Sequence, residues 1–195
     1  MITCLNIRNN ILKFQYVTVS TTGTWKSGEY PCAAKIVCQL IRGLEEQNPW
    51  SISGVFRDVW NPYTVSHRLV NLLCGLAVFQ KAGGKACPIL ENKIFEHIRF
   101  CAAFVNFNLE RHLQYNHLFK NYVALAVFAS AANKKTFRFK FLEKAIKKGI
   151  RQTILPDGGH VERSPMYHFL AIMDFDILRA SKIFSKEFSC LLEKT

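Results

Sequence analysis

The sequence predicts an all-α protein whose helices pack as antiparallel neighbours. Apolar residues recur every three to four positions over most of residues 66–184. Capping residues or prolines stand where these periodic stretches begin, and glycine-containing turns separate several of them. Helices joined by short loops of this kind pack side by side in opposite directions. We expect five of them, at about residues 66–83, 88–106, 116–132, 137–154 and 164–184.

Local signals place these helices. Ser66 is the expected N-cap of the first, Pro88 opens the second, and Ser164 followed by Pro165 opens the fifth. The third is apolar nearly all round after Tyr122, so we expect other helices to cover it on several sides. The fourth presents a basic face that contains Lys144, Lys147, Lys148 and Arg151.

The first 65 residues are less regular. Residues 11–19 are rich in β-branched and aromatic types, which predicts a strand or an extended segment. A short helix is expected within residues 31–47, with Ile36, Val37, Leu40, Ile41 and Leu44 on one face. Residues 48–63 contain Pro49, Gly54 and Pro62, which favours a structured loop.

Composition limits the class of protein. Of the 195 residues, 49% are hydrophobic and 21% are charged, as in soluble globular proteins, and no apolar run approaches the length of a membrane span. The net charge of +12 favours an anionic partner, whether nucleic acid, acidic polysaccharide or anionic lipid. No helix-turn-helix, zinc-finger or RNA-binding signature supports nucleic acid, so we expect none.

Seven cysteines form no CxxC pair and none stands at metal-ligand spacing with histidine, so no metal site is expected. Cys74 and Cys101 lie in apolar helical stretches and are expected to be buried free thiols. Arg8 and Lys13 interrupt the apolar N-terminal residues, so no signal-peptide core is recognisable. Either the protein is not exported or its true start lies upstream, which leaves both periplasm and cytoplasm open.

Two segments concentrate polar side chains at helix N-termini, residues 115–121 and 155–168. If the third and fifth helices run parallel, with the fourth returning between them, both N-termini lie at one end of the bundle. Five side chains then converge on one cleft, where the helix dipoles favour an anion. They are Asn116, His117, Arg163, Tyr167 and His168.

Each of these residues also has an ordinary structural interpretation. An asparagine before a helix is commonly a cap, and a histidine is commonly a satisfied polar residue. The segment Asp157-Gly158-Gly159 alone is a turn, and basic residues on a helix usually face solvent. The periodicity of the sequence does not decide between these structural roles and a functional role for the same residues.

Three sequence segments resemble motifs of one protein family, and they occur in the same order as in that family. ILPDGGHVERSPMYH (residues 154–168) is similar to the motif that ends the helical region of heparinase II/III-like polysaccharide lyases. NHLFKN (116–121) resembles their Asn-His motif, and WNPYTVSHRLVN (60–71) resembles a stretch upstream of it. The resemblance spans about residues 48–180, so we interpret 48–195 as a partial domain of this type and 1–47 as an N-terminal extension.

The resemblance implies an α/α toroid of antiparallel helices, followed by a C-terminal β-sandwich domain. It also implies cleavage of uronate-containing polysaccharide by β-elimination, without a metal or an organic cofactor. Carried over to this sequence, Asn116 and His117 face the uronate carboxylate and Tyr167 transfers the proton. The expected substrate-binding residues are Arg163, His168, His160, Trp60, Tyr63 and Arg68.

The chemistry suits these residue types. Removing the C5 proton of a uronate places charge on its carboxylate, which hydrogen bonds from Asn116 and His117 stabilise. A tyrosine ordinarily has a pKa of about 10, so a tyrosine acting as base needs cationic neighbours, and Arg163 and His168 are the candidates for Tyr167. The same tyrosine then protonates the leaving glycosidic oxygen.

One departure from the family bears on activity. The histidine that the family supplies from beyond the toroid has no counterpart up to Thr195, and no β-sandwich is recognisable. We therefore expect a truncated toroid with little lyase activity by itself. The alternative is a non-catalytic basic helical module that binds acidic glycans.

Overall fold

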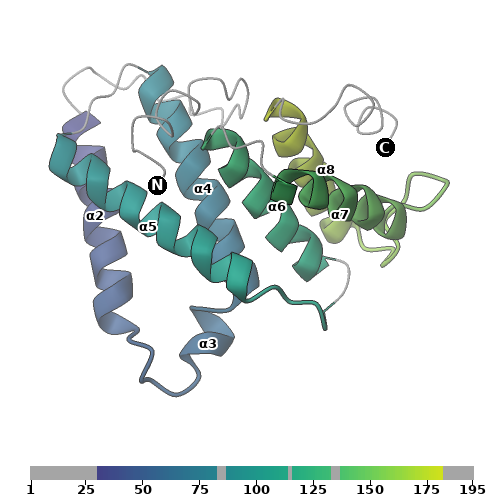
Figure 1. Ribbon diagram of the computed structural model, residues 1–195, viewed down its shortest axis with the longest axis horizontal. Helices are drawn as coiled ribbons and strands as arrows, with labels where there is room; N and C mark the ends of the chain where they lie inside the picture. The colour runs from purple at the N-terminus through teal and green to yellow at the C-terminus, as the bar shows by residue number, and fades with distance from the viewer. Residues whose placement is uncertain (1–29, 83–86, 114–115, 133–136, 182–195) are drawn as a thin grey trace.

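The computed structural model describes residues 30–82, 87–113, 116–132 and 137–181. Within these ranges it contains seven helices and no strand, which confirms the all-α prediction (Figure 1). The predicted extended segment at residues 11–19 and the end of the last predicted helix lie outside the described residues. The helices are α2 Tyr30–Gln47, α3 Val55–Asp58, α4 Pro62–Lys81, α5 Pro88–Phe107, α6 Asn116–Ala131, α7 Phe137–Thr153 and α8 Pro165–Ala180.

The N-terminal signals of α5 and α8 are confirmed, whereas that of α4 is corrected. Ser164 accepts a hydrogen bond from the backbone N–H of Tyr167 and so caps α8. The cap of α4 is Asn61, whose Oδ1 lies 2.8 Å from the backbone nitrogen of Thr64, and Pro62 occupies its first turn. The predicted cap, Ser66, lies fully buried inside the helix. The expected loop at residues 48–63 also contains the short helix α3.

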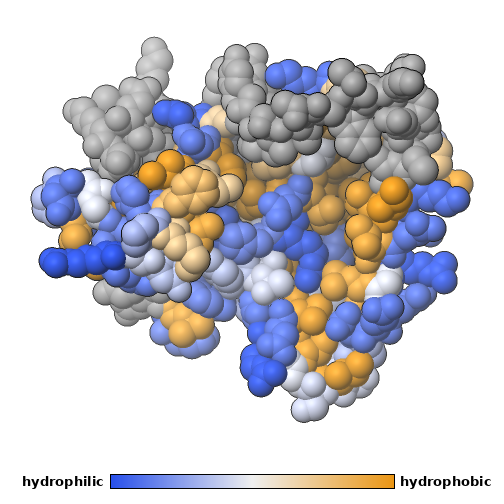
Figure 2. Space-filling view, turned by 180° about the vertical axis from the view of Figure 1, so that it is seen from behind, coloured by the Kyte–Doolittle hydropathy of each residue, from blue (hydrophilic) through white to orange (hydrophobic). Residues whose placement is uncertain are grey.

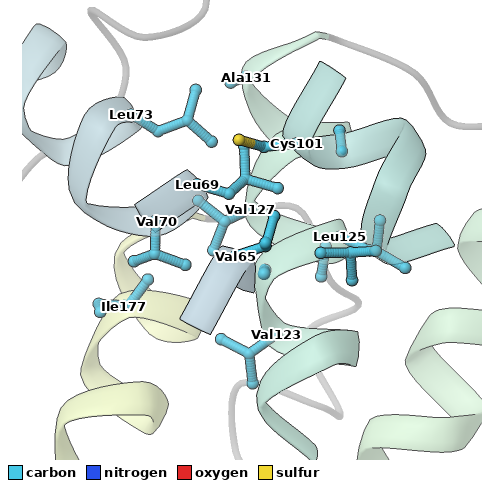
Figure 3. Close-up of a cluster of buried hydrophobic side chains, with 14 of the residues drawn as sticks. Val65, Leu69, Val70, Leu73, Cys101, Val123, Leu125, Val127, Ala131 and Ile177 are labelled. Carbon is cyan, nitrogen blue, oxygen red and sulfur yellow. The ribbon is translucent and has the colours of Figure 1, made fainter. Parts of the chain in front are cut away.

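Helix α6 is the central element. It contacts α4, α5, α7 and α8, as its almost uniformly apolar sequence predicts, and Figure 1 shows it between α4 and α7. Its buried side chains meet those of α4, α5 and α8 in the core, where Leu69, Cys101, Val127 and Ile177 come together (Figure 3). Burying each valine, leucine or isoleucine side chain there contributes about 1.5–3 kcal/mol to stability.

Helix α2 packs against α5. The imidazole Nδ1 of His97 lies 2.7 Å from Oε1 of Glu45, and the Cys38 thiol lies 3.4 Å from the carbonyl oxygen of Leu90. The predicted apolar face of α2 is only partly correct, because Ile36 and Leu40 are exposed. Val37, Ile41 and Leu44 do pack against the core.

Helices α6 and α8 run in the same direction, as the site hypothesis requires. The ammonium of Lys120, in the second turn of α6, pairs with Asp174 in the middle of α8. Near the C-terminal ends of both helices the hydroxyl of Ser130 donates to the carbonyl oxygen of Ser181 at 3.1 Å. Helix α7 returns in the opposite direction, because Tyr122 of α6 meets Phe141 and the earlier Phe119 meets Gly149. The N-termini of α6 and α8 therefore lie at one end of the bundle.

The surface mixes hydrophilic and hydrophobic side chains, as the rear view in Figure 2 shows. On α8 the exposed large hydrophobic residues are Met166, Phe169, Ile172 and Met173. None of the helices described here combines the length and hydrophobicity of a membrane-spanning segment. Cys101 is fully buried, as predicted, and burial raises the pKa of its thiol to about 11, whereas Cys74 is only partly buried.

Candidate functional site

The side chain of Asn116 links the N-terminus of α6 to the loop before α8. Its Nδ2 donates to Oε1 of Glu162 at 2.9 Å, and its Oδ1 lies 3.1 Å from Nε2 of His160. Because an amide oxygen only accepts, His160 donates through Nε2–H. These bonds use one of the two amide hydrogens of Asn116, which leaves the other for a ligand.

His160 is held as a neutral imidazole. Its Nδ1 accepts a hydrogen bond from the backbone N–H of Glu162 at 3.1 Å, so both ring nitrogens are assigned by their partners. The residue is 2% exposed, and this burial is the main reason that the pKa of its imidazole is lowered. The carboxylate of Glu162 raises that pKa and nearby His168 lowers it, but the net shift is downward. His160 therefore orients Asn116 from inside the protein, in place of the substrate contact expected from the sequence.

The loop between α7 and α8 has a turn geometry that returns His160 to α6. Ile154 and His160 form an isolated antiparallel bridge, and the intervening Gly158 has a φ of 84°, which glycine adopts readily. Asp157 Oδ1 accepts from the backbone N–H of Gly159 at 2.9 Å. Arg163 has a φ of 48°, a left-handed conformation that is uncommon for a residue with a Cβ and that clusters at functional sites.

Tyr167 lies against this network. Its ring stacks on the imidazole of His160 with centroids 6.0 Å apart and an interplanar angle of 28°. Since His160 is bonded to Asn116, the three side chains form one continuous series of contacts. Tyr167 as a residue is partly exposed at this end of the bundle.

His117 is oriented by a buried polar network. Its Nδ1 lies 3.2 Å from Oε1 of Glu110, and Oε2 of Glu110 accepts from Nδ2 of Asn121 at 3.1 Å. Asn121 also bonds to the hydroxyl of Ser66, and its Oδ1 accepts the backbone N–H of Glu110. Because Ser66, Asn121 and Glu110 are all buried, the network fixes one ring orientation of His117, whose side chain remains 43% exposed.

Tyr63 of α4 closes the site on the other side of His117. The two rings stack with centroids 4.3 Å apart, and Tyr63 also meets His67 edge to face at 4.7 Å. Burial, with nearby acidic groups, raises the pKa of Tyr63, so its hydroxyl stays protonated. Burial and the positive charge of Lys120 lower the pKa of His67 to about 4, so its imidazole is neutral at pH 7. A cavity of about 10 Å³ lies between these side chains and Asp174.

Other predicted residues have different surroundings. The indole N–H of Trp60 donates to the carbonyl oxygen of Asn48 at 2.8 Å, and only 2% of the residue is exposed. The guanidinium of Arg68 lies 4.9 Å from the centre of the Trp60 ring and bonds to the carbonyl oxygen of Val59. Trp60 is therefore a buried packing residue in place of the expected substrate contact, whereas Arg68 is partly buried and its substrate contact stays a prediction.

Arg163 and His168 were expected beside the Tyr167 hydroxyl. Arg163 is exposed, and His168 is partly buried with an Nδ1 that has no hydrogen-bond partner in the structure. Among the hydrogen bonds of the described residues, none joins either side chain to Tyr167.

A scan of family models and searches of curated proteins and of solved structures found no match to this chain.

Three acidic or histidine side chains of the site were not predicted from the sequence: Glu110, Glu162 and His67. Glu162 lies within residues 154–168 and His67 within residues 60–71, the two motif segments that contain most of the predicted site residues. Their place in these segments could have indicated them as site residues. Glu110 precedes α6 by six positions, and only the folded chain shows that it reaches His117. In the described ranges no three His, Cys, Asp or Glu side chains gather in a way that could hold a metal ion.

Proposed function

We propose that this chain is part of a polysaccharide lyase of the heparinase II/III type, with its helices forming part of an α/α toroid. Its substrate is a uronate-containing polysaccharide, cleaved by β-elimination. The observation that carries the proposal is the contact series Asn116–His160–Tyr167 at the shared end of α6 and α8, with His117 beside it. These are the residue types that the resemblance assigns to carboxylate binding and proton transfer.

In this mechanism the uronate carboxylate binds at the N-terminus of α6. The free amide hydrogen of Asn116 donates to it, and His117 donates through Nε2 when its ring is protonated, since Nδ1 faces Glu110. The helix dipole adds to the attraction for an anion. As the C5 proton leaves, negative charge moves onto the carboxylate, and these donors stabilise it without moving.

Tyr167 is the proposed proton-transfer residue. In its anionic form the hydroxyl oxygen takes the C5 proton, and the resulting phenol donates that proton to the glycosidic oxygen as the bond from C4 breaks. The products are an unsaturated uronate and a free hydroxyl end. His160 keeps Tyr167 and Asn116 at a fixed separation, because it contacts both.

A β-sandwich domain, which the resemblance implies, would complete the cleft and supply a further histidine. We therefore propose that turnover depends on that domain, because it positions the substrate against Tyr167.

The test measures the ultraviolet absorbance of unsaturated uronate products. This chain, and a form extended through the β-sandwich domain, are incubated with a panel of uronate polymers. We expect turnover by the extended form. Tyr167→Phe should abolish it, and Asn116→Ala should lower kcat by about 10²–10³ through loss of one donor.

A matched control separates chemistry from folding. Ser130→Ala removes a hydroxyl from the C-terminal end of α6, away from this contact series, and should leave kcat unchanged. No product from the extended form with any uronate polymer, while it still binds those polymers, would favour the non-catalytic glycan-binding alternative.

A further inference from the structure

A second and larger hollow lies between α6 and α7. Its volume is about 490 Å³, within the roughly 300–1,000 Å³ of ligand sites, compared with about 10 Å³ beside Asn116. Phe119 lines both spaces and separates them. We call this hollow the α6–α7 groove, and its lining residues come from α6, α7 and the segment before α6.

The charges of the α6–α7 groove are all of one sign. Arg111, Lys144 and Lys148 line it, and no aspartate or glutamate does. Glu143, the acidic residue of α7, pairs with Lys147 at 2.9 Å instead. Lys144 and Lys148 are four residues apart on one helix face, a like-charge spacing that disfavours the helix. An anion bound between these cations would relieve that repulsion.

The remaining lining is aromatic and apolar. Tyr122 and Phe141 meet edge to face across the groove with ring centroids 6.1 Å apart. Phe119 and Gly149 lie where α6 and α7 approach closely, since a Cβ on Gly149 would be 2.6 Å from the Phe119 ring. Gln152 supplies an exposed amide. Aromatic walls with convergent polar groups suit a ligand that has apolar faces and fixed charges.

We infer that the α6–α7 groove binds an acidic oligosaccharide, with sugar rings against Tyr122 and Phe141. Its carboxylate or sulfate groups would face Arg111, Lys144 and Lys148. The choice of a sugar over another polyanion rests on the proposed function, because the groove shares Phe119 with the candidate site. It would hold a part of the polysaccharide away from the bond that is cleaved.

The test is calorimetric titration of this chain at low and moderate ionic strength. The probes are a galacturonate oligosaccharide, a sulfated uronate oligosaccharide, a neutral oligosaccharide of equal length, and single-stranded DNA of equal charge. The groove variant is the double substitution Lys144→Gln and Lys148→Gln. The control is Lys140→Gln with Arg151→Gln, which removes the same charge from exposed positions of α7 that do not line the groove.

We expect the groove variant to weaken binding of an acidic oligosaccharide about tenfold or more, through lost charge-assisted hydrogen bonds. The control should change it less than about twofold. An equal loss in both variants, no measurable binding of either acidic sugar, or tighter binding of DNA than of the sugars would overturn the inference.

Asn116→Ala distinguishes this inference from the proposed function. Loss of turnover in Asn116→Ala of the extended form, with groove binding unchanged, supports both. Groove binding that depends on Lys144 and Lys148, together with no unsaturated product from the form extended through the β-sandwich domain, supports the groove and contradicts the lyase. Binding that depends on Asn116 and is unaffected by the groove variant contradicts the groove alone.

Discussion

The ammonium of Lys120 and the carboxylate of Asp174 form an ion pair between α6 and α8, with side chains only 9% and 7% exposed. The pair lies one helical turn inside Asn116 and two turns inside Tyr167, on the two helices that carry the candidate site. It fixes the position of one helix along the other. Burial raises the pKa of Asp174, and the charge of Lys120 opposes this effect.

Breaking the pair from one side should destabilise the fold strongly. Asp174→Asn leaves the Lys120 ammonium buried without an anion, which we expect to lower the free energy of unfolding by about 3–5 kcal/mol. The double variant Lys120→Met with Asp174→Leu should recover most of that loss, because no buried charge remains. Urea denaturation of the native protein and both variants measures these free energies of unfolding. A single variant within about 1 kcal/mol of the native protein, or a double variant as unstable as the single, would contradict the structural role of the pair.

Stability should fall on acidification, in part because of His67. An ordinary histidine has a pKa of 6.5, whereas that of His67 is about 4 in the folded protein. Between these pH values the unfolded chain binds a proton that the folded protein does not, so protonation favours unfolding. His67 costs no stability above pH 6.5. Its cost grows as the pH falls from 6.5 to about 4 and is constant below that. His97 and His160, whose pKa values burial also lowers, act in the same direction.

The variant His67→Gln should therefore show a smaller decrease of thermal midpoint between pH 7 and pH 4 than the native protein. His112→Gln, at an exposed position, is the control and should follow the native curve. Parallel curves for His67→Gln and the native protein would show that His67 titrates normally when folded.

Two glycines in helices should respond oppositely to alanine. In Gly149→Ala the new Cβ would lie 2.6 Å from the Phe119 ring, so overpacking should cost about 1–3 kcal/mol, offset by up to about 1 kcal/mol of helix propensity. At Gly75 nothing lies within 4 Å of the new Cβ, so only the propensity gain of about 1 kcal/mol remains. Thermal unfolding of the two variants compares them. Equal stabilisation would mean that α6 and α7 are not in close contact at Gly149.

The fold was predictable from the sequence where one local signal decides it. Proline at the start of α5, Ser164 before Pro165, and the uniformly apolar α6 each have one physical meaning, and the structure agrees. The prediction that Ser66 caps α4 was wrong, because serine is common both as a helix cap and as a buried hydrogen-bond partner. Its contact with Asn121, fifty-five positions later, decides between these roles, and no local pattern contains it.

For the candidate site, the sequence predicted the motif residues but not the side chains that orient them. The motif strings predicted Asn116, His117 and Tyr167 as site residues, and the parallel course of α6 and α8 brings them to one end of the bundle. The carboxylates that orient Asn116 and His117 were not identified from the sequence. Glu162 bonds to Asn116 across 46 positions, and Glu110 reaches His117 only through the fold of the segment before α6. Trp60 and Arg68 lie in a matched string too, but a string does not reveal which of its side chains face the core.

The central claim is that a uronate carboxylate binds between Asn116 and His117, and its most direct test is a nuclear magnetic resonance titration of the isotope-labelled chain. A uronate oligosaccharide is added, with a neutral oligosaccharide as control and Tyr167→Phe as the variant that keeps the carboxylate donors. We predict saturable shifts of the Asn116 side-chain amide and the His117 ring, which persist in Tyr167→Phe and are absent with the neutral sugar. Unchanged Asn116 and His117 signals at saturating uronate, or identical shifts with both sugars, would contradict it.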